Sequence, residues 1–143
     1  MSEIQTYATH RRFHPLFHFI AFPLSLIYWV STLWNLWETP GAHTAFGALG
    51  GLVLVLATFL TRLYGLRAQD RLIRLEETLR MQRLLPAELQ TRIPELRVGQ
   101  FVGLRFASDA ELPGLVKATL DEKLEGEAIK KRIQTWRGDY FRV

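Results

Sequence analysis

The 143-residue sequence contains no cysteine, and several kinds of chemistry are excluded with it. A chain without thiols has no disulfide, no zinc–thiolate site and no thiol nucleophile. The sequence also lacks a P-loop and a dinucleotide-binding fingerprint, and no serine stands in a histidine–acid context. Acidic pairs such as Glu76-Glu77 and Asp121-Glu122 lie among basic residues at helical spacing, as on a solvated helix face. We therefore expect a protein that is not an enzyme.

Charge is missing from two long stretches of the chain. Residues 15–37 are 23 positions without Asp, Glu, Lys or Arg, and residues 44–61 are 18 more. Since about 20 apolar residues cross a hydrocarbon layer of about 30 Å, both runs are long enough to span, the second with the help of residues 62–66. Two helices of this kind exceed what a chain of this length can bury as a soluble core. The first run also starts too far inside the chain and is too long for a signal peptide.

The six residues 38–43 between the runs contain the turn signal Pro40-Gly41, which is enough only to reverse the direction of the chain. The sequence therefore predicts a transmembrane helical hairpin over residues 15–66, with spans at about 15–37 and 44–66 and an outer loop at 38–43. An N-terminal tail (residues 1–14) and a C-terminal region (residues 67–143) flank it.

Basic residues predict the orientation of this hairpin. Arg11 and Arg12 precede the first span, Arg62 and Arg67 follow the second, and the loop has none. The positive-inside rule then places both termini in the cytoplasm, where these four arginines would contact lipid headgroups. From Arg67 onward the chain has 15 basic and 12 acidic residues, a balance too even for a nucleic-acid partner.

Small residues in the second span predict close helix packing. Gly47 and Gly51 form a G-x-x-x-G pair with Gly50 beside them. Glycines at this spacing let two backbones approach closely in lipid. The partner is expected to be the first span, with a neighbouring copy or another subunit as the alternatives.

No stop signal follows the second span until Pro86, so we expect one helix of roughly forty residues that continues into the cytoplasm. Ala68, Leu72, Leu75 and Leu79 follow one another at steps of four, three and four, the pattern of a short coiled-coil-like seam. This apolar stripe must be covered by the C-terminal segments, another copy of the chain, or a partner protein.

The C-terminal region is expected to be helical. Residues 96–106 fit a strand or a helix, and helix is favoured because a lone strand has no partner. Ser108 and Glu111 have the spacing of a capping box and predict a helix start. Ile129, Ile133, Trp136 and Tyr140 predict a last helix. The fold class is thus all-α and integral to the membrane: a two-helix hairpin, an extended second helix and a small helical C-terminal region.

Histidines are the candidates for a cofactor site. His10, His14 and His18 repeat every four residues, the spacing at which histidines on one helix face share a metal ion. Pro15 interrupts this series and leaves His14 and His18 for a metal or haem, while His43 lies at the other end of the span. A structural or interfacial role is the favoured interpretation, so no cofactor is expected.

Several of these segments resemble a known family. They are Tyr7, His10, Arg11, Pro15 and His18, the glycine-rich second span, the run Leu104-Arg-Phe-Ala-Ser-Asp109, Glu111-Leu-Pro113, Ile129-Lys-Lys131, Trp136-Arg137 and Asp139-Tyr140. The pattern resembles small bacterial two-pass membrane proteins that are catalogued only as a domain of unknown function. The resemblance implies a location in the bacterial inner membrane and no activity, substrate or cofactor.

The expected function is that of a non-enzymatic inner-membrane protein that acts by association, as a homo-oligomer or as an accessory subunit of a larger membrane complex. Its partners would be lipids, copies of itself and other membrane proteins. One rival is a small oligomeric channel or transporter lined by hydroxyl side chains, namely Ser25, Ser31, Thr32, Thr58 or Thr61. A second rival is a redox subunit that binds a metal or haem through His14 and His18.

Overall fold

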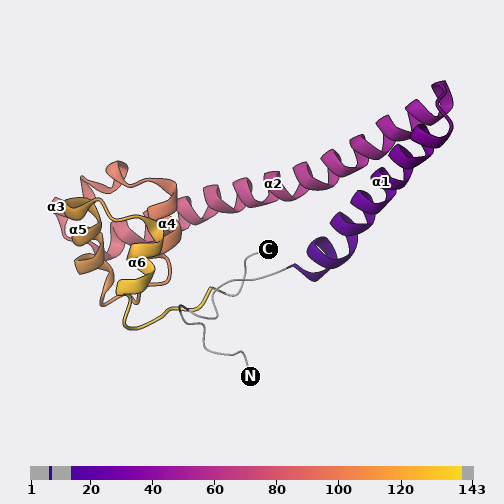
Figure 1. Ribbon diagram of the computed structural model, residues 1–143. Helices are drawn as coiled ribbons and strands as arrows, with labels where there is room; N and C mark the ends of the chain where they lie inside the picture. Colours follow the sequence, from indigo (N-terminus) through magenta and orange to yellow (C-terminus); the bar gives the residue numbers. More distant parts are fainter. Residues whose placement is uncertain (1–6, 8–13, 140–143) are drawn as a thin grey trace. The chain divides into compact units, whose positions relative to one another are not determined.

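The computed structural model describes Tyr7 and residues 14–139, and the elements of this part are helices (Figure 1). The chain divides into two compact units. The first, which we call the hairpin unit, is described from residue 14 to residue 67. The second, which we call the C-terminal unit, is described from residue 68 to residue 139 and includes Tyr7.

The first span starts with a wide turn before it becomes a regular α-helix. The π-helix η1 covers Leu16–Ala21, and α1 follows at Phe22–Glu38. Pro23, in the first turn of α1, has no N–H to donate to an earlier carbonyl, and wide turns of this kind accommodate such a break. The N–H of Phe22 bonds to the carbonyl of Phe17, five residues earlier. The Ser25 hydroxyl donates to the carbonyl of Phe22 at 2.8 Å.

A three-residue turn, residues 39–41, joins α1 to α2. The Thr44 hydroxyl lies 2.9 Å from the carbonyl oxygens of both Thr39 and Gly41 and closes this turn. The less exposed positions of both helices recur at steps of three and four, which is the spacing of two helices packed side by side. In α1 they include Phe22, Ser25, Trp29, Thr32 and Leu36, and in α2 they include Thr44, Ala48, Gly51, Val55 and Thr58.

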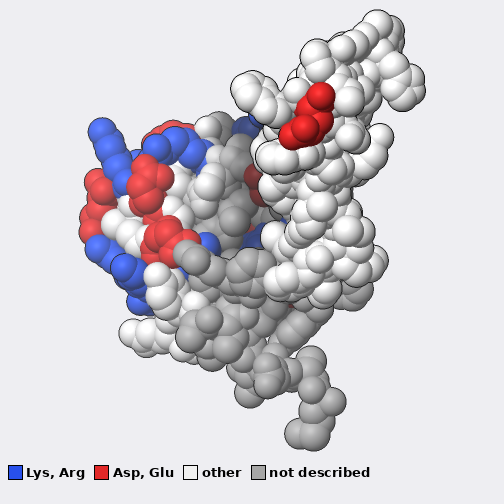
Figure 2. All heavy atoms as spheres, turned by 45° about the vertical axis from the view of Figure 1, so that its right-hand side comes forward, with Lys and Arg blue, Asp and Glu red and all other residues white. Residues whose placement is uncertain are grey.

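Both helices of the hairpin are long and apolar enough to cross a membrane. Within the most apolar 18 residues of each helix, only 11% of positions are buried in the protein. The two apolar helices are therefore not core helices of this chain. Figure 2 shows that the two units differ in surface charge. Charged side chains gather over the C-terminal unit and are nearly absent from the visible surface of the hairpin unit. The predicted all-helical fold with two candidate membrane spans is confirmed at this level.

α2 is one helix of 43 residues, Ala42–Leu84, as expected from the lack of a stop signal before Pro86. Five shorter helices follow in the C-terminal unit. They are α3 (Ala87–Gln90), the 3-10 helix η2 (Ile93–Glu95), α4 (Val98–Leu104), α5 (Leu112–Glu122) and α6 (Gly126–Arg132). The helix favoured for residues 96–106 is present as α4.

A single apolar core holds the C-terminal unit together. Met81 from the end of α2 and Leu85, which follows that helix, join buried residues from α4, α5 and α6, namely Phe101, Leu104, Leu112, Val116 and Ile129. α4 and α6 approach each other through glycines. A β-carbon added to Gly126 would lie 2.6 Å from the carbonyl oxygen of Gly99, and one added to Gly103 would lie 3.0 Å from that of Gly126. Close backbone contact between α4 and α6 therefore requires glycine at residue 126.

Two of the predicted features of this unit are wrong. α5 starts at Leu112 rather than after Ser108, with Pro113 in its first turn, where a missing N–H costs nothing. The Glu111 carboxylate accepts a hydrogen bond from the Thr135 N–H at 3.0 Å instead of capping its own helix.

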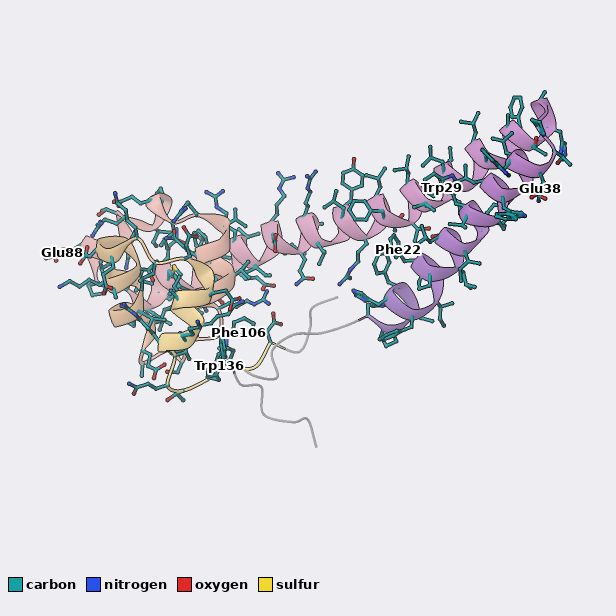
Figure 3. All side chains as sticks on the ribbon, in the orientation of Figure 1. Phe22, Trp29, Glu38, Glu88, Phe106 and Trp136 are labelled. Atoms are coloured by element: carbon teal, nitrogen blue, oxygen red, sulfur yellow. The ribbon has the colours of Figure 1, made fainter. Side chains whose placement is uncertain are left out.

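The last helix also ends earlier than expected, at Arg132. The chain beyond it is extended, and Trp136 forms an isolated antiparallel bridge with Ala107. The Arg137 N–H donates to the Phe106 carbonyl at 2.8 Å, and the rings of Phe106 and Trp136 lie 5.0 Å apart (Figure 3). Tyr140 lies outside the described residues.

Candidate functional site

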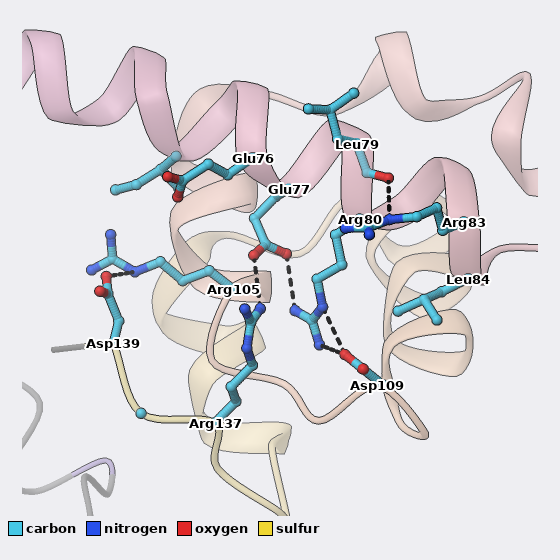
Figure 4. Close-up of a pocket in the computed structure, with 12 residues that line it drawn as sticks. Glu76, Glu77, Leu79, Arg80, Arg83, Leu84, Arg105, Asp109, Arg137 and Asp139 are labelled. Carbon is cyan, nitrogen blue, oxygen red and sulfur yellow. Dashed lines mark hydrogen bonds and ion pairs between the residues drawn. The ribbon is translucent and has the colours of Figure 1, made fainter. Parts of the chain in front are cut away.

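A buried arginine lies at the centre of the C-terminal unit. Arg80, on α2, is only 6% exposed. Its guanidinium donates to the Glu77 carboxylate at 3.0 Å and to the Asp109 carboxylate at 2.8 Å (Figure 4). It also donates to the Ala107 carbonyl at 2.7 Å. These bonds join α2 to the segment between α4 and α5. Because a buried guanidinium is costly unless its donors are satisfied, this geometry stabilises one arrangement of the two segments.

The buried Glu77 carboxylate extends the network to the end of the described chain. Its second oxygen accepts a hydrogen bond from Arg137 at 3.2 Å. A further ion pair, between Arg105 and Asp139, has an N–O distance of 3.3 Å. The run Leu104–Asp109 and the pair Trp136-Arg137, both quoted above for the family resemblance, thus meet at the same face of α2.

A cleft of about 730 Å³ adjoins this network (Figure 4). Four arginines and four carboxylates line it, so their formal charges cancel: Arg80, Arg83, Arg105, Arg137, Glu76, Glu77, Asp109 and Asp139. Arg80 lowers the pKa of Asp109, chiefly through its hydrogen bonds, and keeps that carboxylate ionised at neutral pH. A general acid or base needs a pKa near the working pH, and this shift moves the pKa of Asp109 away from it.

No sequence motif pointed to Glu77 or Arg80. The signal that was present is their helical spacing with Ile73 and Met81, which are buried on the same face of α2. Charged residues on an apolar helix face are expected to find partners there.

The predicted seam lies on another side of α2 and is uncovered. Leu72, Leu75 and Leu79 are 59%, 57% and 51% exposed, and Ala68 is exposed as well. At 100° per residue, these residues point away from Ile73, Glu77 and Met81, which are buried in the C-terminal unit. The described C-terminal segments therefore do not cover the stripe.

The three glycines of the second span have different surroundings. A β-carbon on Gly51 would lie 2.9 Å from the Trp29 side chain and 3.0 Å from the Trp29 α-carbon. No atom would come within 4 Å of a β-carbon on Gly47 or Gly50. Gly51 thus contacts α1 of the same chain, while the other two glycines leave room for a further helix.

We expect Gly51→Ala to destabilise the hairpin by about 2 kcal/mol, because its new methyl group would overlap the backbone of Trp29. The measurement is unfolding of the detergent-solubilised protein in SDS, followed by Trp29 fluorescence with the other three tryptophans replaced by Phe. Gly50→Ala is the matched control, since its methyl group meets open space and should leave the transition unchanged. Equal effects of the two substitutions would contradict the assigned contact.

Four of the predicted ligand and headgroup residues, His14, His18, Arg62 and Arg67, lie in the hairpin unit. The Nδ1 atom of His18 is 2.9 Å from the His14 carbonyl oxygen and 3.1 Å from the His14 backbone nitrogen. Within the described part of the chain, no group of three or more His, Asp or Glu side chains could hold a metal ion. The guanidinium of Arg62 lies 5.8 Å from the centre of the Phe17 ring, and Arg67 is exposed. His10, Arg11 and Arg12 lie outside the described residues.

The fold and the site define an all-helical protein with two long apolar helices and a small helical unit that is closed by an ion network. A model of a family of unknown function (DUF6526) matches residues 1–143, and the chain belongs to this family. This confirms the predicted resemblance to a family without an assigned function. No curated protein and no solved structure matches the chain.

Proposed function

We propose that this chain is a non-enzymatic protein of the bacterial inner membrane that acts by association, as a homo-oligomer or as an accessory subunit of a larger complex. Both termini face the cytoplasm in this proposal. The observation that carries it is the exposed stripe of Leu72, Leu75 and Leu79 on α2. A row of leucines held more than half exposed on a fixed helix face is typical of a surface that a second helix covers.

The membrane location is supported by how the hairpin satisfies its polar groups. Hydroxyl groups in the apolar helices donate to carbonyls three or four residues earlier: Ser25 to Phe22, Ser31 to Tyr28, Thr32 to Trp29, Thr58 to Leu54 and Thr61 to Ala57. In lipid no water is present to satisfy such groups, so bonds within the helix are required. The exposed apolar surface of both helices would then contact lipid tails.

The same hydroxyl bonds weigh against a channel. These five side chains were the predicted lining of a pore, and their donors are already used within their own helices. In a redox subunit His18 would have to bind the metal or haem through its Nε2 atom, because its Nδ1 atom bonds to the backbone of His14. Association through the leucine stripe explains more of the described surface than either alternative.

Purification in mild detergent tests this proposal. Light scattering should give a particle that contains more than one protein chain, and Leu72→Gln with Leu75→Gln should reduce the associated fraction at least tenfold by removing the apolar contact. Val98→Gln, at a residue of α4 that is 40% exposed, is the control and should leave the particle intact. A wild-type particle that contains a single copy of this chain and no other protein would contradict the proposal. An absorption band or bound metal in the same sample would favour the redox alternative.

A further inference from the structure

We propose that the leucine stripe on α2 binds a second copy of the same chain, with the two helices parallel and in register. This inference rests on the proposed association and names its partner. In the heptad notation of coiled coils, Ala68 and Leu75 occupy d positions, and Leu72 and Leu79 occupy a positions. These four residues form the seam along which the two helices would meet.

The charges beside the seam select this partner. Arg71 falls at a g position and Glu76 at the e position of the following heptad. In a parallel pair, a g residue lies next to the e residue five positions further along the other helix. Arg71 of each copy would therefore meet Glu76 of the other, and the two-fold symmetry of a dimer makes this contact twice. The stripe thus carries both halves of a self-complementary charge pattern.

Arg71 and Glu76 are available for this contact. Both side chains are exposed, and neither takes part in an ion pair within the residues that the structure describes. Arg80 pairs with Glu77 and Asp109 rather than with Glu76, although Glu76 lies four residues before it. The neighbouring glutamates thus differ: Glu77 is buried and paired within the unit, whereas Glu76 lines the edge of the same cleft and its side chain is exposed.

An antiparallel pair does not use these charges. It places g positions opposite g positions and e positions opposite e positions, so that Arg71 no longer meets Glu76. Two copies inserted in a membrane with the same topology are also parallel. The face of α2 that carries Ile73, Glu77 and Met81 is occupied by the core of its own unit, so the leucine stripe is the side left for a second copy.

The seam is short, and its length fits a protein held in a membrane. Residues 68–79 supply four core positions, too few for a stable dimer of free helices. Confinement to a bilayer raises the effective concentration of the partner, so that a weak contact is sufficient. The charge pairs then contribute register and partner choice more than affinity.

Disulfide trapping in native membranes tests the inference, because the chain has no cysteine of its own. Leu75→Cys places the only thiol at the centre of the seam, where two copies would bring the sulfurs together. Mild oxidation should convert most of the protein to a dimer. Arg74→Cys, on the same helix and exposed but off the seam, is the control and should cross-link at least tenfold more slowly.

Charge exchange in the Leu75→Cys background tests the register. Arg71→Glu and Glu76→Arg should each slow cross-linking by about fivefold, because each places like charges side by side in both symmetric contacts. The double variant Arg71→Glu/Glu76→Arg should restore the original rate. Only a parallel, in-register pair of identical helices predicts this recovery.

Equal cross-linking at positions 74 and 75, or no recovery in the double variant, would overturn the inference. Absence of cross-linking would overturn it as well. If the wild-type particle then contained a second kind of protein that Leu72→Gln with Leu75→Gln releases, the proposed association would stand with a different partner. If that particle contained a single chain, both the association and the self-pairing would fail.

Discussion

Glu77→Gln is expected to lower the free energy of unfolding of the C-terminal unit by about 3 kcal/mol. The substitution keeps the shape of the side chain and removes the negative charge that Arg80 and Arg137 share. Since Arg80 is buried, it would lose one of its two carboxylate partners without gaining water. Proteolysis of the detergent-solubilised protein over a series of urea concentrations, with mass spectrometry of the fragments from α5, measures this loss.

Glu76→Gln is the control for this prediction. It makes the same chemical change one residue earlier, on an exposed side chain. The urea midpoint of the C-terminal unit should move little, because an exposed charge contributes little to stability. Equal losses from the two substitutions would show that the buried network does not determine the stability of this unit.

Gly126→Ala is expected to destabilise the C-terminal unit by about 2 to 3 kcal/mol. A methyl group at this position would lie 2.6 Å from the Gly99 carbonyl oxygen, and a backbone atom cannot rotate aside as a side chain does. α4 and α6 would have to separate, and the packing around Ile129 would loosen with them. The same urea and proteolysis measurement reports this change.

The partner glycine of this contact supplies the comparison. A β-carbon on Gly99 meets no atom within 4 Å, and Ala is a better helix former than Gly by up to about 1 kcal/mol. Gly99→Ala should therefore leave the unit unchanged or make it slightly more stable. A loss of stability as large as that of Gly126→Ala would contradict the described crossing of α4 and α6.

The helices that could be predicted are those with a strong local signal. Two charge-free runs and the turn at Pro40-Gly41 were sufficient for the hairpin, and the lack of a breaker before Pro86 was sufficient for the single helix α2. The leucine stripe was equally visible, because its spacing depends only on neighbours in sequence. Membrane insertion and the orientation of the hairpin remain predictions from composition.

The C-terminal unit shows where such signals fail. Ser108 and Glu111 have the spacing of a capping box, yet Glu111 bonds to Thr135, which no local rule anticipates. Trp136 has the spacing of the third apolar residue on one helix face, after Ile129 and Ile133, but its ring packs on Phe106 and the chain there is extended. Tertiary contacts outweighed local propensity at both places.

The buried ion network of Glu77 and Arg80 could not be predicted from sequence motifs, for a related reason. Glu76 and Glu77 are identical neighbours in sequence, and no capping or turn motif says which one the fold will bury. In the structure both Arg80 and Arg137 pair with Glu77, and neither pairs with Glu76. A helical wheel of α2 places Glu77 with Ile73 and Met81, and that is the signal that sequence reasoning could have used.

The pairing of Glu77 with Arg137 joins residues 60 positions apart, and this distance orders events during synthesis. The ribosome delivers the hairpin first, then the glutamate and Arg80, and the second arginine only much later. Until Arg137 emerges, the Glu77 carboxylate lies among apolar side chains with only one of its two arginine partners. This favours an open, protease-sensitive state of the nascent chain. Emergence of Arg137 therefore completes the network, and a chain cut short between Leu124 and Arg137 should be more sensitive to protease than one that includes this arginine.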